Sequence, residues 1–138
     1  MGVTMEWTGG CLCGAIKYRS KSDPQWVGHC HCISCQRWTG SPVFAGACFA
    51  PDDFEWIQGE PGYYRSSKEV LRSFCPNCAS PLAFHRGDVR VTVTAGTLDN
   101  PERLQPTFHI YAEHEHDWAK FDDGLPRQEG FFPEENQK

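Results

Sequence analysis

Clustered cysteines are the feature that most restricts what this chain can fold into. Seven of its eight cysteines lie in three short groups, namely Cys11 and Cys13, then Cys30, Cys32 and Cys35, then Cys75 and Cys78. Thiolates this close in sequence converge most naturally on a soft metal ion, and zinc is the usual one. We therefore expect a fold that is organised around metal-bound loops.

Zinc chemistry indicates how these ligands divide. A structural zinc is closed by four protein ligands, whereas a catalytic zinc has three and keeps one position open. The triplet supplies three ligands from one short loop and can define a site alone, which leaves the two pairs to form a site of four. Spacing alone does not fix this division. In a second arrangement, His29 or His31 completes the triplet and both sites are closed.

The eighth cysteine and the other histidines have different predicted roles. Cys48 lies in an apolar stretch, where a free cysteine behaves as a small buried hydrophobe, so we expect it not to be a ligand. His85 and His109 lie in predicted strands and are interpreted as structural. His114 and His116 form a His-x-His pair among acidic residues, for which a solvated turn is favoured over a third metal site.

Composition limits the class of protein. The chain has 138 residues, so one domain is expected, over residues 1–127, followed by an acidic tail at 128–138 that we expect to fray. Its net charge of -5 argues against a nucleic-acid binder. No apolar run approaches the roughly 20 residues that span a bilayer, and no secretory signal is recognisable. We expect a soluble cytoplasmic protein, and a reducing cytosol disfavours disulfides.

Hydrophobic alternation predicts a chain made mostly of strands. They are expected within 15–19, 42–50, 54–56, 63–65, 70–74, 81–85, 88–95 and 108–111. In the clearest of them, two sets of side chains face opposite ways: Val89, Val91, Val93 and Ala95 on one side, Arg90, Thr92 and Thr94 on the other. A helix is predicted only over 34–38, with a short helical turn that starts at Pro101.

The cysteine groups and their flanking residues resemble a known family. Most of the resemblance lies in 10–14 (GCLCG), 30–41 (CHCISCQRWTGS) and 74–78 (FCPNC), with later similarity in 95–101, 106–111, Trp118 and 123–126. In this order they resemble the glutathione-dependent formaldehyde-activating enzyme family, whose domain also occurs in centromere protein V. Two positions depart from the family pattern without removing a ligand: Ile33 replaces a small hydroxylated residue, and Ala79 replaces glycine.

The resemblance implies a fold, two metal sites and a reaction. The fold would be mainly β, a single-domain Mss4-like β-tent with zinc knuckles. Two zinc ions per chain would be bound, a structural one by Cys11, Cys13, Cys75 and Cys78, and a catalytic one by Cys30, Cys32 and Cys35. The reaction would be that of a carbon–sulfur lyase run in reverse, in which glutathione or a related thiol adds to formaldehyde or another small aldehyde. Its product with glutathione and formaldehyde is S-hydroxymethylglutathione.

This chemistry is consistent with a metal bound by three thiolates. Such a zinc carries net negative charge, so it activates water poorly but accepts a soft fourth ligand. A thiol bound there loses its proton and is ready to attack a small carbonyl. The basic residues near the cysteine groups that could pair with a substrate carboxylate are Arg37, Lys68, Arg72 and Arg86. Arg37 is the preferred candidate, because it follows the triplet directly. The alternative is a non-catalytic zinc-stabilised binding module, either a thiol carrier or a protein-interaction domain, which the acidic pI disfavours.

Overall fold

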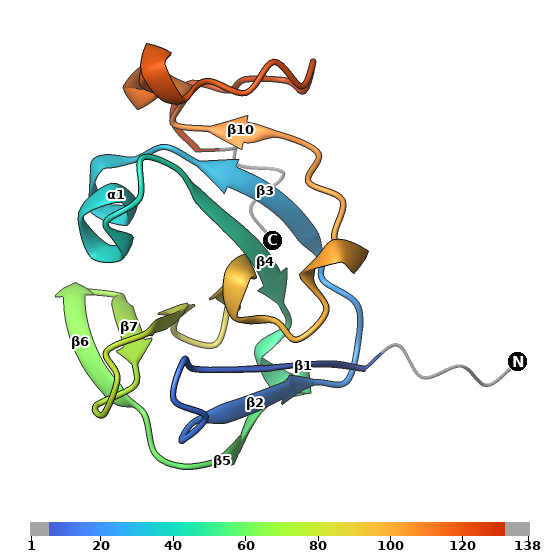
Figure 1. Cartoon of the computed structure of the whole chain (residues 1–138), viewed down its shortest axis with the longest axis vertical. Helices are drawn as coiled ribbons and strands as arrows, with labels where there is room; N and C mark the ends of the chain where they lie inside the picture. Colours follow the sequence, from blue (N-terminus) through green and yellow to red (C-terminus); the bar gives the residue numbers. More distant parts are fainter. Residues whose placement is uncertain (1–5, 132–138) are drawn as a thin grey trace, which may run out of the picture.

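The computed structural model describes residues 6–131, which form two β-sheets and one short α-helix (Figure 1). The smaller sheet contains β1 (Trp7–Gly10), β2 (Lys17–Ser20) and β5 (Phe54–Gln58). The larger sheet has the order β10-β3-β4-β9-β8-β7-β6, and its strands are β3 (Trp26–Cys30), β4 (Phe44–Phe49), β6 (Gly62–Ser67), β7 (Val70–Phe74), β8 (Pro81–Arg86), β9 (Arg90–Thr94) and β10 (His109–Ile110). The helix, α1, spans Ile33–Thr39.

The predicted mainly β architecture is confirmed. The predicted helix over 34–38 corresponds to α1, and the turn at Pro101 is a 3-10 helix. Two strands were not predicted, β1 and β3. β3 has Val27 in the main core on one face and Trp26 and Cys30 in a second apolar cluster on the other, so its sequence shows no polar-apolar alternation.

One face of the larger sheet forms the main core against the smaller sheet. Cross-strand neighbours Val27, Ala47, Val93 and Ala83 line up on this face, and Trp7, Ile16 and Tyr18 pack against it from the other sheet. Cys48 points away from this row and is fully buried, with its Sγ 3.8 Å from Oε1 of Gln25. Within the described residues it lies outside both cysteine groups.

The opposite face of the larger sheet lines a cavity. The strict alternation of β9 sends Val91 and Val93 into the core, while Arg90 and Thr92 face the cavity. Gly28 lies on this same side, and a Cβ there would come within 2.3 Å of the Phe108 ring. Glycine at this position therefore lets an aromatic ring lie directly on the sheet.

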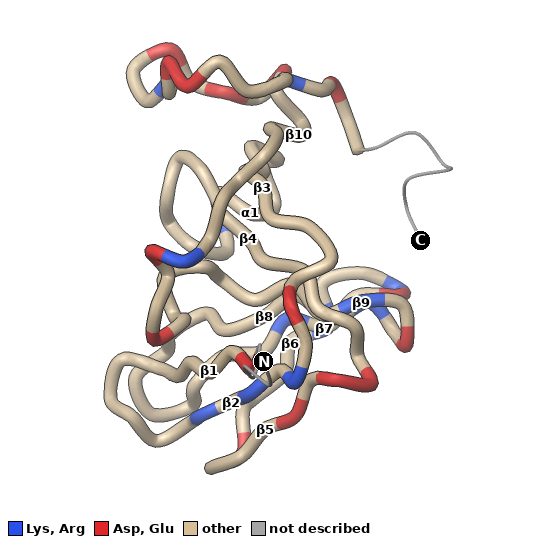
Figure 2. The backbone as a smooth tube through the Cα atoms, turned by 90° about the vertical axis from the view of Figure 1, so that its right-hand side faces the viewer, with Lys and Arg blue, Asp and Glu red and all other residues tan. Residues whose placement is uncertain are grey.

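The segment after β10 folds back over it, above β3 in Figure 1, and contains many of the Asp and Glu positions coloured red in Figure 2. His109 N–H donates to the Pro126 carbonyl, and Gln128 N–H donates back to the His109 carbonyl, both at 2.8 Å. Residues 128–131 of the predicted tail are thus bonded to the domain, and the rest of it lies outside the described residues. No helix within 6–131 is long and apolar enough to cross a membrane.

Candidate functional site

The first cysteine group joins the two sheets. Cys11 and Cys13 follow β1, Cys75 and Cys78 lie between β7 and β8, and the four sulfurs lie within 4.8 Å of one another. The Cys11–Cys13 and Cys13–Cys75 sulfur distances are 3.7 and 3.8 Å. Four sulfurs bound tetrahedrally at about 2.3 Å from a zinc ion would lie about 3.8 Å apart. The donor set and its spacing therefore fit a closed four-thiolate zinc site.

N–H groups donate hydrogen bonds to the sulfurs of this group. Cys11 Sγ accepts from the Ile16 N–H at 3.2 Å, and Cys75 Sγ accepts from the Asn77 and Cys78 N–H groups at 3.3 and 3.4 Å. The Asn77 side-chain amide donates to Cys13 Sγ at 3.2 Å. Such bonds orient metal ligands and favour their charged form.

Both knuckles end in left-handed backbone. Gly14 follows the first pair at φ 84°, and Ala79 follows the second at φ 68°. The sequence resemblance indicated glycine at the second position, and the structure shows why, since this conformation is unfavourable for a residue with a Cβ. Ala79 adopts it because its N–H donates to the Cys75 carbonyl at 2.8 Å, which closes the turn.

The second cysteine group lies where β3 meets α1. Cys30 is the last residue of β3, Cys32 caps the helix and Cys35 lies in its first turn, with all three sulfurs within 4.8 Å of one another. Cys32 Sγ accepts from the Cys35 N–H at 3.3 Å. Hydrogen bonds from the Cys30 and Cys35 thiols hold the pKa of Cys32 well below its usual range, and correspondingly raise that of Cys30. The negative charge of the cluster is thus concentrated on Cys32, and the thiolate is the form in which a cysteine binds a soft metal.

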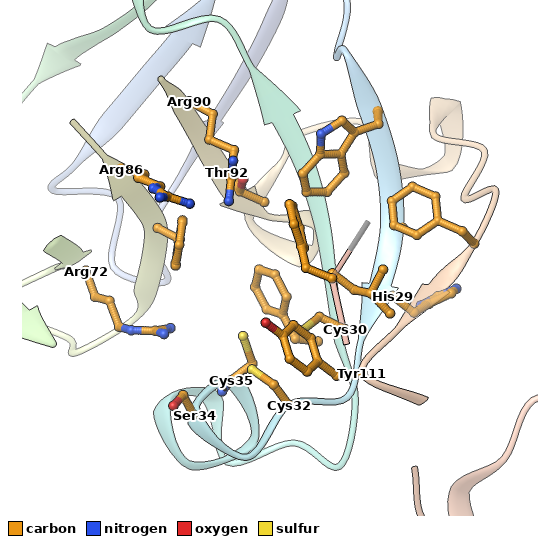
Figure 3. Close-up of a pocket in the computed structure, with 17 residues that line it drawn as sticks. His29, Cys30, Cys32, Ser34, Cys35, Arg72, Arg86, Arg90, Thr92 and Tyr111 are labelled. Carbon is orange, nitrogen blue, oxygen red and sulfur yellow. Dashed lines mark hydrogen bonds between the residues drawn. The ribbon is translucent and has the colours of Figure 1, made fainter. Parts of the chain in front are cut away.

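The three sulfurs face a cavity of about 450 Å³, drawn in Figure 3. This volume is within the range of small-molecule sites, roughly 300–1,000 Å³. Its apolar lining includes Trp26, Phe44, Phe84 and Phe108, and its polar lining includes Tyr111, Thr92 and three arginines, Arg72, Arg86 and Arg90. A ligand of the triplet metal would therefore be enclosed by aromatic rings on some sides and by cations on another.

Arg37, the sequence candidate for binding a substrate carboxylate, lies elsewhere. It lines a separate shallow depression with Ile33, Gln36 and the 113–116 turn. The arginines of the cavity come instead from β7, β8 and β9. Arg90 was foreshadowed in the sequence, because it lies on the polar face of the strand predicted at 88–95. In a sheet that is covered on both sides, such a polar face meets a cavity rather than solvent.

The histidines next to the triplet belong to a separate hydrogen-bonded chain. His31 Nε2 lies 2.8 Å from His109 Nδ1, and His109 Nε2 lies 2.9 Å from a carboxylate oxygen of Asp123. Since the carboxylate accepts, His109 donates from Nε2 and accepts from His31. His29 and His31 fall in groups with His109 and acidic residues, and not in the group of three sulfurs. This geometry favours three protein ligands at the triplet.

The hydrogen-bonded row of histidines is anchored in the segment after β10. Glu115 lies 4.0 Å from His31 Nε2 and is held by Arg127, whose hydrogen bond lowers the pKa of Glu115. Burial lowers the pKa of His31. A neutral, fully buried imidazole between Cys30 and Cys32 thus fixes the backbone that presents their sulfurs.

The remaining histidines have structural contacts. His85 Nε2 is 2.8 Å from the Ser73 hydroxyl, and burial lowers its pKa to about 4. His116 Nε2 is 2.7 Å from Gln36 Oε1, and His114 is exposed. Neither His114 nor His116 is part of a metal-ligating group in the described chain, which agrees with the predicted turn.

Comparisons with known proteins place this geometry in a family. The family model described as "Glutathione-dependent formaldehyde-activating enzyme" matches residues 6–114, which include all seven clustered cysteines. The chain is 34% identical over 79 residues to a fission yeast (Schizosaccharomyces pombe) protein named "Uncharacterized lyase C29B12.13". That alignment covers 57% of each protein, so the chain spans little more than half the length of this curated relative.

A solved structure shares the fold. A crystal structure of a Rhodobacter sphaeroides protein superposes with a TM-score of 0.56 at 18% identity, over 87% of this chain and 98% of that one. The family match extends over most of the chain and contains both cysteine groups that the fold assembles. The chain therefore belongs to the glutathione-dependent formaldehyde-activating enzyme family.

Proposed function

We propose that this protein is a zinc-dependent enzyme of the carbon–sulfur lyase type that adds glutathione or a related thiol to formaldehyde or another small aldehyde. The observation that carries this proposal is the contrast between the cysteine groups. Four sulfurs form a complete ligand set, whereas Cys30, Cys32 and Cys35 form a set of three that faces a cavity. Three ligands beside a cavity are the pattern of a catalytic zinc.

The seven cysteines would hold two zinc ions per chain, one in each group. When bound to the triplet, zinc would lower the pKa of a substrate thiol and so supply a thiolate near neutral pH. The cavity walls contribute by excluding water, because Trp26, Phe44 and Phe108 surround the sulfurs with aromatic rings. A site with little water favours attack by sulfur over competing hydration of the aldehyde.

The addition also needs a proton. As the thiolate sulfur bonds to the aldehyde carbon, the carbonyl π-electron pair moves to oxygen, which then takes up one proton. The Tyr111 side chain lies beside the three cysteines in the cavity (Figure 3), and burial raises the pKa of its hydroxyl. It is therefore protonated at neutral pH and is our candidate donor to the developing alkoxide. Its φ of 54° is unusual for a large residue, which is typical of functional positions.

The family description supports the thiol and aldehyde classes, and the name of the yeast relative supports a lyase. The direct test is exchange NMR with ¹³C-formaldehyde and glutathione, in which the zinc-loaded protein should accelerate adduct formation and breakdown. Tyr111→Phe should reduce that rate about 100-fold while thiol binding is retained. Tyr64→Phe, at a tyrosine that is 65% exposed, is the matched control.

Cobalt substitution tests where the thiol binds. Glutathione should increase the sulfur-to-metal charge-transfer bands of the cobalt protein as a fourth sulfur joins Cys30, Cys32 and Cys35. A flat spectrum at saturating thiol, together with no acceleration of the spontaneous reaction, would reject the enzyme and favour the non-catalytic binding module.

A further inference from the structure

The cavity has a cationic wall that the reaction chemistry does not use. The register of strands β7, β8 and β9 forms this wall from two rows of cross-strand neighbours. One row is Arg86 and Arg90, and the other is Arg72, Phe84 and Thr92. All five side chains line the cavity. In Figure 3 the three arginines reach into it from one side, and the cysteine sulfurs face it from another.

Two of these arginines are buried without an acidic partner. Arg86 is paired with Glu69 at 3.0 Å, whereas no ion pair within residues 6–131 involves Arg72 or Arg90. Arg72 is 7% exposed and Arg90 is 8% exposed. A buried charge is normally paired, because its desolvation costs several kcal/mol. This wall therefore contains two buried cations for which the described chain supplies no carboxylate, although the charge of Arg72 also acts on the Cys32 thiolate across the cavity.

Unsatisfied hydrogen-bonding atoms lie on the same wall. Arg72 Nη1 and Thr92 Oγ1 are both buried and have no partner in the structure. Buried polar atoms are rarely left unpaired, so each requires an explanation. A ligand oxygen in the cavity would accept from Arg72 Nη1 and from the Thr92 hydroxyl.

Aromatic rings hold the guanidinium groups by their faces. The Arg72 guanidinium lies 4.8 Å from the Trp38 ring centre and 5.3 Å from that of Phe84, and the Arg90 guanidinium lies 4.8 Å from that of Phe131. Stacking of this kind stabilises the cation and fixes its plane. Arg72 Nε donates to the Ser66 hydroxyl at 2.9 Å, so the groups of Arg72 that face a ligand are its Nη groups, and paired N–H groups of this kind match the geometry of a carboxylate.

We propose that Arg72, Arg90 and Thr92 form a carboxylate-binding subsite in the cavity of the three cysteines. The substrate thiol is then one that carries a carboxylate, as cysteinyl peptides do, and a neutral thiol binds poorly. This inference rests on the proposed function for the position of the sulfur at the triplet. The subsite itself is defined by the two unpaired cations and the two unsatisfied atoms.

The first test changes the ligand and leaves the protein unmodified. Isothermal titration of the full-length, zinc-loaded chain compares glutathione with its diester, in which both carboxyl groups are esterified, and with S-methylglutathione, which keeps both carboxylates but has no thiol. We expect the diester to bind about 10- to 100-fold more weakly than glutathione, the loss typical of hydrogen bonds to a charged group. Equal binding of glutathione and its diester, or no detectable binding of glutathione, would overturn the subsite.

The second test changes the protein. Arg72→Gln and Arg90→Gln should each weaken binding of S-methylglutathione about tenfold or more and should reduce the preference for acid over diester. Arg90→Lys keeps the positive charge but loses the paired N–H groups of the guanidinium. It replaces Arg90→Gln in this test if the glutamine variant does not fold. Arg65→Gln is the matched control, because Arg65 lies on neighbouring β6, is exposed and lies outside the cavity. Unchanged binding by folded Arg72 and Arg90 variants would also overturn the subsite.

The two proposals fail in different ways. If S-methylglutathione binding depends on the arginines but no adduct exchange is catalysed, the carboxylate subsite stands and the lyase function fails. If exchange is catalysed equally with glutathione and its diester, and the two bind equally, the lyase function stands and the carboxylate subsite fails.

Discussion

The four-cysteine group joins the two sheets near the surface, whereas the three-cysteine group faces an interior cavity. In the first group Cys13 is exposed, and two backbone N–H groups are directed at the Cys75 sulfur. In the second, Cys30 and Cys35 are buried beneath aromatic and cationic side chains. Similar thiolate ligands thus occur in two settings, one that joins distant segments and one that leaves space for a small molecule. The difference teaches that ligand number and surroundings, rather than ligand type, distinguish a structural from a catalytic site.

The largest expected effect separates the groups by stability. Cys75→Ser should unfold the protein or make it insoluble, because the binding free energy of a structural zinc, on the order of 10 kcal/mol, is also folding free energy. Thermal unfolding followed by circular dichroism, with zinc content measured in parallel, checks this. Cys48→Ala is the control, a buried cysteine that lies outside both groups. A Cys75→Ser protein with unchanged unfolding temperature and two bound zinc ions would contradict the structural role.

The second prediction concerns the triplet. Cys35→Ser should remove one zinc ion of two and abolish adduct exchange, while the unfolding temperature falls by only about 2–8 °C, as for an ordinary substitution in a small domain. The reason is that α1 and β3 are also held by packing around Phe44, Phe108 and Ile110. If Cys35→Ser and Cys75→Ser unfold alike, the triplet is structural and the contrast between the groups is lost.

A smaller effect is expected from the side-chain bond to Cys13. Asn77→Ala removes the amide that donates to Cys13 Sγ, and it should weaken zinc binding at the four-cysteine group about 10- to 100-fold. Competition with a chromogenic chelator measures this affinity. Zinc at the triplet should be unaffected, and Asn100→Ala, in an exposed turn, should change neither site. Equal weakening at both sites would indicate a general loss of stability instead.

The smallest effect tests the backbone of the knuckles. Ala79→Gly should raise the free energy of unfolding by about 0.5–1 kcal/mol, because relief of left-handed strain is partly offset by the greater freedom of glycine in the unfolded chain. Gly14→Ala is the reverse change at the other knuckle and should lower stability by a similar amount, since a Cβ there meets no atom within 4 Å. Urea titrations give both values. A less stable Ala79→Gly protein would show that the strain argument is wrong.

Much of the fold follows from patterns that are local in sequence. The strand at 88–95 was predictable because its apolar residues face the core and its polar residues face the cavity. The cysteine groups were predictable because metal ligands cluster at turns. β3 was missed because it is covered on both sides and contains Gly28, which gives no pattern. Burial on both sides removes the polar-apolar alternation on which a strand prediction depends.

The contents of the cavity were harder to predict, because they depend on register between strands far apart in the chain. Arg72 and Arg90 are 18 positions apart in sequence and come together only because β8 lies between their strands. The bond between His31 and His109 likewise requires the parallel pairing of β10 with β3. Arginine on a strand ordinarily indicates a solvated face, so Arg37, adjacent to the triplet in sequence, was the nearer candidate.

The pairing of β10 with β3 has a consequence for how the protein is made. β3 and its cysteine leave the ribosome well before β10, because the strand that covers the β3 edge is separated from it by more than half of the chain; that strand is only two residues long. Until β10 has been synthesised, the nascent chain presents an unpaired strand edge beside an apolar surface, and such an edge can pair wrongly with another chain. The same late segment supplies Phe108, Ile110 and Tyr111 to the cavity. Synthesis therefore completes the closed edge and the cavity in a single late step, and a ribosome that stalls earlier releases a chain with neither.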